Sequence, residues 1–353
     1  MDITYSAEDN FYDMATVFDI VAAAPNLREL DLNLERWGCI LAKTAWSFNF
    51  RSHPFVRFPP LEVLRLRGYR FDDGAGGSWA WSWVELLALV GDVRPGEERI
   101  RRRETNLDTW MGRMDWGSLR TLEIGGLEEW VLDRLGGDKL PELRELVLCG
   151  GWRGGDRGRV AEFITETAKP LESLSLIDFD LKVEDEFMSD ASFRRELKSF
   201  TLRPDHKNRS PIGNDMLHHL LTSSPKLESV DVTLKREDIS WDEGLYRYFI
   251  ASPTLRHLTL RFPSPDGPHL DYASLTGNDT DPLINNETTL ELFKELRHRK
   301  QGSELESMHF YVGDWEARDA VTWMPSGNFR VAFYSCFIYE GEERCEGTQV
   351  RQR

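Results

Sequence analysis

One short phrase recurs along this chain and limits what it can fold into. It places leucine, or a similar apolar residue, at its first, fourth and sixth positions, and its clearest copy is Leu171, Leu174 and Leu176, preceded by Pro170. Residues two apart in an extended strand point to the same face, so the last two leucines face one way. A proline ends any helix before it. Each copy therefore predicts a corner followed by a short strand with one buried face.

Nine copies of this phrase are present. Their first residues are Leu27, Leu61, Leu119, Leu143, Leu171, Leu197, Leu227, Leu255 and Leu305. From Leu119 to Leu255 the copies follow one another every 24 to 30 residues, with apolar stripes of helical period between them. Strands joined through helices run parallel, and no single repeat can bury its own leucines. We therefore expect an α/β solenoid, one domain of residues 1–353 with a parallel concave sheet and outer helices.

The ends and one interruption of the pattern complete the expected organisation. Residues 1–24 are predicted to form an N-terminal capping helix. Residues 72–117 break the rhythm and predict an insertion or long loop. Two tryptophans are expected to hold the far end of this insertion: Trp110 and Trp116. Residues 329–339, apolar on both faces, predict a closing strand, and the charged residues 340–353 predict a flexible tail.

Charge and hydropathy exclude several kinds of partner. The chain carries 44 basic and 60 acidic residues, a net charge of -16, which repels nucleic-acid phosphates and anionic lipid. No apolar run approaches the length of a membrane span, and the acidic N-terminus is unlike a signal peptide. We therefore expect a cytoplasmic or nuclear protein that binds neither nucleic acid nor membrane.

The cysteines fit a reducing compartment. The four of them, Cys39, Cys149, Cys336 and Cys345, include no C-x-x-C pair and no zinc spacing. Free thiols in an intracellular chain are the first expectation. A disulfide between Cys336 and Cys345 across a hairpin is the alternative.

The phrase L-x-x-L-x-L at this period resembles the leucine-rich repeat. The P-x-L-x-x-L lead-in and the irregular repeat lengths are similar to the repeat region of F-box/leucine-rich-repeat proteins, especially those abundant in fungi, over about residues 7–339. The resemblance implies an irregular leucine-rich-repeat horseshoe that serves as the substrate-recognition arm of an SCF-type ubiquitin ligase. The ninth repeat position holds residues such as Glu35 and Tyr69 where the family has Asn or Cys, so a less regular horseshoe is expected.

The resemblance does not extend to an F-box. The stretch before Leu27 is too short for that helical module, so a Skp1-type adaptor is an expected partner only if an F-box lies upstream. The expected function is protein–protein interaction with an unknown partner. A stand-alone leucine-rich-repeat scaffold without ligase linkage and, as a third possibility, an enzyme are the alternatives.

The residues between the leucines are the candidate site, because they point to the face opposite the buried one. The candidate partner-binding residues on this concave face are Arg65, Arg67, Arg203, Asp231, His257, Arg261, His309 and Tyr311. Arginine and tyrosine are enriched at binding hot spots. The alternative is that these are solvated positions chosen for strand propensity and solubility.

Catalytic, cofactor and metal sites are not expected. The glycines at 150, 151, 154, 155 and 158 follow a strand, but their spacing is not the G-x-G-x-x-G of dinucleotide loops. His257 and His309 lie on neighbouring predicted strands without an evident third ligand, and catalytic zinc sites use three. No G-x-S-x-G, H-E-x-x-H or Walker motif occurs. The chain is therefore expected not to be an enzyme.

Overall fold

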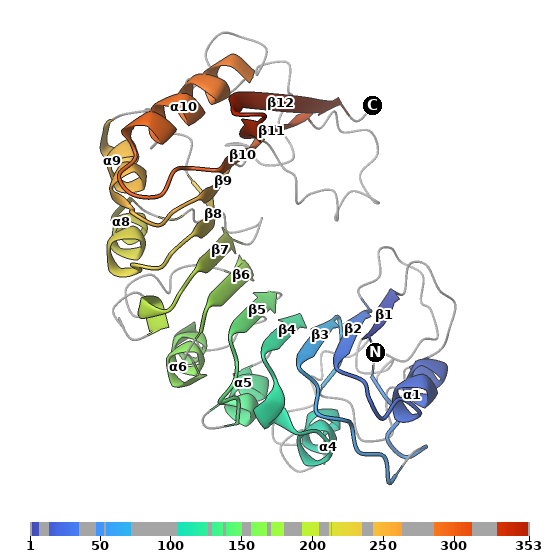
Figure 1. Ribbon diagram of the computed structural model, residues 1–353. Helices are drawn as coiled ribbons and strands as arrows, with labels where there is room; N and C mark the ends of the chain where they lie inside the picture. Colours follow the sequence, from blue (N-terminus) through green and yellow to red (C-terminus); the bar gives the residue numbers. More distant parts are fainter. Residues whose placement is uncertain are drawn as a thin grey trace, which may run out of the picture. The chain divides into compact units, whose positions relative to one another are not determined.

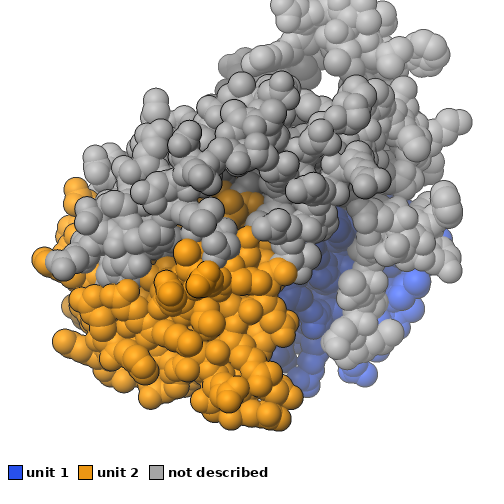
Figure 2. Space-filling view, turned by 90° about the horizontal axis from the view of Figure 1, so that it is seen from above, with its two compact units in different colours: residues 1–169 blue, residues 170–353 orange. Residues whose placement is uncertain are grey.

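The computed structural model describes residues 2–6, 14–34, 47–52, 54–71, 105–125, 129–136, 139–149, 157–167, 171–179, 193–204, 212, 214–234, 243–262, 286–312 and 330–351. Within them the chain is α/β and its strands are mostly parallel. The chain divides into two compact units, Met1–Lys169 and Pro170–Arg353 (Figure 2). The repeats predicted a single domain. A repeating phrase carries no mark of where one compact unit ends, so the sequence did not predict this division.

The first unit contains an open parallel sheet. Its strands pair in sequence order: β1 (Asp2–Ser6), β2 (Glu29–Asn33), β3 (Val63–Arg67), β4 (Thr121–Gly125) and β5 (Glu145–Cys149). Its helices lie to one side of the strands (Figure 1): α1 (Met14–Ala22), α4 (Asn106–Arg113), α5 (Glu129–Leu135) and α6 (Arg157–Thr167). A 3-10 turn, η1 (Trp116–Ser118), leads into β4.

The second unit contains parallel strands closed by an antiparallel hairpin. The parallel strands pair in sequence order: β6 (Ser173–Phe179), β7 (Ser199–Pro204), β8 (Ser229–Thr233), β9 (His257–Phe262) and β10 (Ser307–Val312). β11 (Arg330–Tyr339) and β12 (Glu342–Arg351) follow antiparallel. The helical elements are η2 (Phe193–Arg195), α8 (Asn214–Ser223), α9 (Glu243–Ala251) and α10 (Asn286–Arg299). The three α-helices lie on one side of these strands (Figure 1).

The leucine phrases form the cores of both units, as predicted. The three apolar residues of each of the nine phrases are buried, and none is more than 4% exposed. Neighbouring phrases align residue for residue: Leu64 pairs with Leu122, and Leu258 pairs with Met308. The helices contribute apolar stripes to the same cores, such as Phe163 and Ile164 of α6. The predicted strands and their parallel order are confirmed.

The far end of the predicted insertion is ordered around Trp110. This side chain is fully buried; its ring stacks on Phe58 at 4.3 Å between centroids, and its Nε1 donates to the Tyr69 hydroxyl at 2.9 Å. The Tyr69 hydroxyl in turn donates to Asn106 Oδ1 at 2.6 Å. Trp116 is also buried, so both tryptophans hold this end as expected. Residues 105–118 are thus helix and turn rather than loop, and residues 72–104 lie outside the described part.

The N-terminus differs from the predicted capping helix. Residues 2–6, D-I-T-Y-S, form β1, which pairs in parallel with β2. Ile, Thr and Tyr favour strands, and this preference together with the available edge of β2 explains the difference. The helix itself is confirmed over Met14–Ala22, with Met14, Phe18 and Val21 buried. Phe11 of the predicted stripe lies outside the described residues.

The C-terminus is a strand where a flexible tail was expected. The closing strand is present as β11, and after a two-residue turn β12 runs back along it from Glu342 to Arg351. The turn residues Glu340 and Gly341 have φ of 53° and 84°, the left-handed conformation that tight hairpin turns require. The many charged residues of this segment led to the prediction of a disordered tail. The Glu-Gly pair, which indicates a hairpin turn, was overlooked. Cys336 and Cys345 are paired across this hairpin and joined by a disulfide, as in the alternative considered above.

We expect this disulfide to stabilise the second unit. It closes a short loop, with a sequence separation of 9 residues, for which chain-entropy arguments give about 2–3 kcal/mol. Reduction should lower the midpoint of chemical unfolding by a corresponding amount. The Cys345→Ser variant, which cannot form the bond, should unfold at the same midpoint with and without reductant. Equal midpoints for the oxidised and reduced wild-type protein would show that the bond contributes nothing.

Candidate functional site

In each unit the strands present alternate side chains to the face of that unit's sheet opposite its helices; we call it the helix-free face, because no helix of the described residues lies on it. In the second unit it consists of Ser173, Ser175, Ser199, Thr201, Arg203, Ser229, Asp231, Thr233, His257, Thr259, Arg261, Ser307, His309 and Tyr311 from the parallel strands. In the first unit Arg65 and Arg67 of β3 occupy the equivalent positions, between buried leucines. All eight candidate residues lie on this face, and most of them are partly exposed rather than buried.

The two candidate arginines of the first unit are held by acidic neighbours. Arg67 pairs with Asp31 of β2 at 2.7 Å and with Glu123 of β4 at 3.4 Å. Arg65 pairs with Glu29 of β2 and lies 3.7 Å from the same Glu123 carboxylate. Burial raises the pKa of Glu123, while Arg67 acts in the opposite direction. Among the described residues, three carboxylates surround the two arginines, which gives this cluster a net negative charge. Its arginines are therefore already occupied by ion pairs within the unit.

In the second unit three candidate residues form one ion-paired group, which we call the Arg-Asp-Arg cluster: Arg203, Asp231 and Arg261. Arg203 Nη2 donates to Asp231 Oδ2 at 2.7 Å. Arg261 donates to the same carboxylate through Nε at 2.7 Å and through Nη2 at 3.0 Å. Asp231 and Arg261 are 14% and 12% exposed, whereas Arg203 is 30% exposed. The strand order therefore brings together residues 58 positions apart in the chain, from Arg203 to Arg261.

Aromatic side chains adjoin this cluster on the next two strands. The Arg261 guanidinium lies over the Tyr311 ring, 4.0 Å from its centroid. The Tyr311 ring lies 4.8 Å from that of Phe333 in β11, and the His309 ring stacks on Phe333 at 5.9 Å. We call Tyr311, Phe333 and His309 the aromatic platform. A guanidinium over an aromatic ring is a favourable cation–π arrangement, and here it fixes the position of Arg261.

The surroundings of His309 disfavour the charged form of its side chain. Its Nδ1 is buried and has no hydrogen-bond partner among the described residues. Burial lowers the pKa of His309, and the nearby His257 lowers it further, while Asp231 acts in the opposite direction. The folded protein therefore disfavours protonation of this ring.

We expect His309 to make the protein less stable in mild acid. A histidine whose folded pKa lies below its unfolded value contributes stability that is present above the unfolded pKa, about 6.5, and is lost as the pH falls. The melting temperature of the wild-type protein should therefore fall more between pH 7.5 and pH 5.0 than that of the His309→Gln variant. His298→Gln, in exposed α10 sequence, is the matched control. An identical pH response of the wild-type and His309→Gln proteins would contradict the expectation.

His257 lies apart from the cluster and belongs to a different group of side chains. Its Nδ1 is 2.9 Å from Ser307 Oγ, and its Nε2 is 3.8 Å from Glu306 Oε2. His257 and Glu306 are 46% and 50% exposed. This serine–histidine–glutamate group was not foreseen, because Glu306 and Ser307 lie 49 and 50 residues from His257 in the sequence. In the described part of the chain no three His, Cys, Asp or Glu side chains are placed to hold a metal ion.

Two other residues of the helix-free face were missed by the candidate set. Phe333 belongs to β11, which pairs antiparallel and has no leucine phrase, so the sequence offered no register for it. Glu123 had a usable signal, since it occupies the same position in its phrase as Arg65 and Asp231 do in theirs. Residues at equal positions in successive phrases become neighbours across the sheet.

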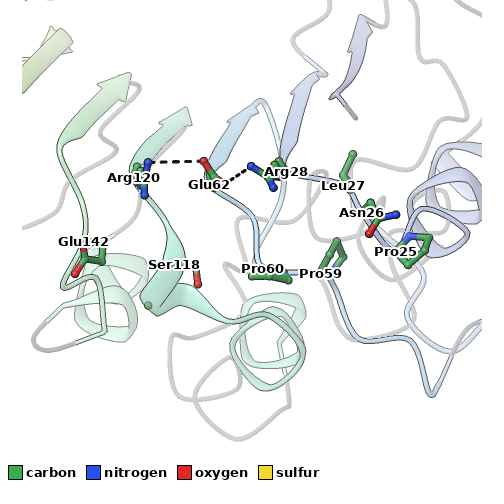
Figure 3. A pocket seen from close by; sticks show the side chains of 11 residues that line it. Pro25, Asn26, Leu27, Arg28, Pro59, Pro60, Glu62, Ser118, Arg120 and Glu142 are labelled. Carbon is green, nitrogen blue, oxygen red and sulfur yellow. Dashed lines mark hydrogen bonds and ion pairs between the residues drawn. The ribbon is translucent and has the colours of Figure 1, made fainter.

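A hollow of about 640 Å³ lies at the helix-to-strand corners of the first unit (Figure 3). It is lined by residues 25–28, 59–60 and 117–118 with Glu62, Arg120 and Glu142. Glu62 lies between Arg28 and Arg120, at 3.2 and 3.9 Å, as the dashed lines in Figure 3 mark. None of the candidate residues lines this hollow. Its charged wall is an exposed ion-pair ladder that links successive strands.

No family model and no curated protein matches this chain. Across the described residues, no helix is long and apolar enough to span a membrane.

Proposed function

We propose that this chain is a leucine-rich-repeat solenoid that binds another protein through the helix-free face of its second unit. The observation that supports this is the Arg-Asp-Arg cluster beside the aromatic platform. Charged and aromatic side chains on one sheet face, partly exposed and fixed by mutual contacts, have the composition of a binding hot spot. Solvated positions chosen for solubility alone would not need such a linked arrangement.

Blocking this face tests the proposal. Ser229 lies in β8 between β7 and β9, so Ser229→Trp places a bulky ring on the face, two residues before Asp231 in the same strand. Thr222→Trp adds the same ring to exposed α8 and serves as the control. Proteins that co-purify with the wild-type chain should remain with Thr222→Trp and decrease about tenfold or more with Ser229→Trp. A set of partners that is unchanged by both substitutions would contradict this use of the face.

We propose further that the partner is a substrate of an SCF-type ubiquitin ligase, by the resemblance of the repeats to F-box/leucine-rich-repeat proteins. The test is co-purification with a recombinant Skp1-type adaptor, both for this chain and for the reading frame with any upstream sequence. Binding of the adaptor by the longer product would support the ligase arm. Partner binding without adaptor binding by either product would favour a stand-alone scaffold.

An enzyme is the competing class, and the Ser307–His257–Glu306 group is the observation that favours it. A nucleophile, a base and an orienting carboxylate are the parts of a hydrolytic triad. His257 and Glu306 are about half exposed, however, so water competes for each contact. We therefore expect no labelling of Ser307 by a fluorophosphonate probe. Labelling that disappears in Ser307→Ala would overturn the non-enzymatic proposal.

A further inference from the structure

We propose that the Arg-Asp-Arg cluster and the aromatic platform bind an acidic segment of a partner protein, with an aromatic or apolar side chain next to the acidic residue. This inference rests on the proposed function and specifies the chemistry of the partner at that face. Two adjoining features support it: a local excess of positive charge, and aromatic surface beside that charge.

The charge excess follows from the composition of the cluster. Among the described residues, two arginines share the carboxylate of Asp231, a local excess of one positive charge in a protein whose net charge is -16. Arg203 donates to Asp231 through Nη2, and its Nε is enclosed by the protein and has no hydrogen-bond partner in the described part of the chain. Arg203 is also the most exposed member of the cluster. The exposed part of this partly desolvated guanidinium favours a second carboxylate.

The first unit provides the contrast that makes this specific. There Arg65 and Arg67 lie on the equivalent face, but Glu29, Asp31 and Glu123 surround them. Three acids against two bases repel an acidic segment, whereas two bases against one acid attract it. Like-charge contacts suppress wrong partners as effectively as opposite charges select right ones.

Among the described residues, the side chains beside the carboxylate of the cluster are short enough to leave room for a partner side chain. Asp231 pairs across the sheet with Thr201 and Thr259, both of them short. Tyr311 and Phe333 follow on the side of Arg261 and are partly exposed. A carboxylate at Arg203 would therefore lie near aromatic surface that can receive an apolar side chain. Tyrosine and arginine are among the residues enriched at the hot spots of protein interfaces.

A random peptide library displayed on phage, selected on the full chain, tests the inference. We expect the enriched peptides to carry Asp or Glu adjacent to an aromatic or apolar residue. They should bind Arg203→Ala about thirtyfold more weakly than wild type, the factor for loss of a hot-spot residue. Arg256→Ala is the matched control: Arg256 is an exposed, ion-paired arginine beside β9, and its loss should leave binding unchanged.

The Asp231→Asn variant distinguishes a role of the Arg-Asp-Arg cluster in peptide recognition from a purely structural role. It removes the negative charge from the cluster, so acidic peptides should bind it more tightly than wild type, and the gain should shrink at high salt. A purely structural role predicts that Asp231→Asn and Arg203→Ala both weaken binding. Enriched basic or neutral peptides that are lost with Ser229→Trp would overturn the acidic preference while leaving the proposed face intact. If the enriched peptides still bind Ser229→Trp, or if no peptide is enriched, the proposed face is not the binding site and the inference is wrong.

Discussion

Replacement of Trp110 by alanine should lower the free energy of unfolding by about 3–5 kcal/mol, the usual cost of truncating a large buried aromatic side chain. Trp110 is fully buried and stacks on Phe58 and Phe48. Its loss would also remove a donor to the Tyr69 hydroxyl, which accepts from Phe48 N and donates to Asn106. The substitution therefore leaves a cavity and weakens the buried network that joins residues 47–50 to α4.

Chemical denaturation measures this loss, and hydrogen exchange locates it. Peptides from β2, β3 and α4 should exchange faster in Trp110→Ala, because the first unit contains the cavity. Phe55→Ala is the matched control: Phe55 is 95% exposed, and its removal should change stability by less than about 0.5 kcal/mol. Similar losses for Trp110→Ala and Phe55→Ala would contradict the central position of Trp110 in the core.

The second large effect is expected at Asp231. Asp231→Asn should lower the free energy of unfolding by about 2–3 kcal/mol, because it leaves two arginines adjacent without a counter-charge. Breaking a fully buried ion pair typically costs about 3–5 kcal/mol and an exposed one about 0–1. The low exposure of Asp231 and Arg261 places this cluster between those limits, nearer the buried one.

A matched acid-to-amide change gives the control for this experiment. Glu196 pairs with Lys226 at 2.5 Å, and both are about half exposed, so Glu196→Gln should cost at most about 1 kcal/mol. Denaturation midpoints of the two variants and the wild type, measured at one salt concentration, make the comparison. If Asp231→Asn lowers the free energy of unfolding no more than Glu196→Gln does, the Arg-Asp-Arg cluster contributes no more to stability than an exposed ion pair.

The fold was predictable to the extent that it is periodic. Each leucine phrase specified its own buried face, and the apolar stripes of α6 and α8 could be recognised in the same way. The strands at the two ends of the chain could not be predicted, since β1 and β12 carry no phrase. Their place depends on an available strand edge in one case and on the Glu340–Gly341 turn in the other.

The sequence predicted which residues lie on the candidate face, but not which of them contact one another. The period of two placed Arg203, Asp231 and Arg261 on one face. Their contacts are diagonal: each guanidinium group binds a carboxylate on the neighbouring strand. A long side chain has several such partners within reach. The equal positions of Asp31 and Glu123 in the phrases on either side of Arg67 were a signal of its acidic surroundings, but which carboxylate each arginine contacts did not follow from it.

By itself the sequence determined which residues are buried and which face the candidate site occupies, because both follow from the two-residue period of a strand and the length of one repeat. The tertiary structure alone decided that the chain forms two units, that Cys336 meets Cys345, and that Phe333 joins Tyr311. The physical reason is that an antiparallel return strand, a disulfide and a cross-strand ring contact each depend on register between segments that share no repeated phrase. Register of that kind is set by packing against a finished core.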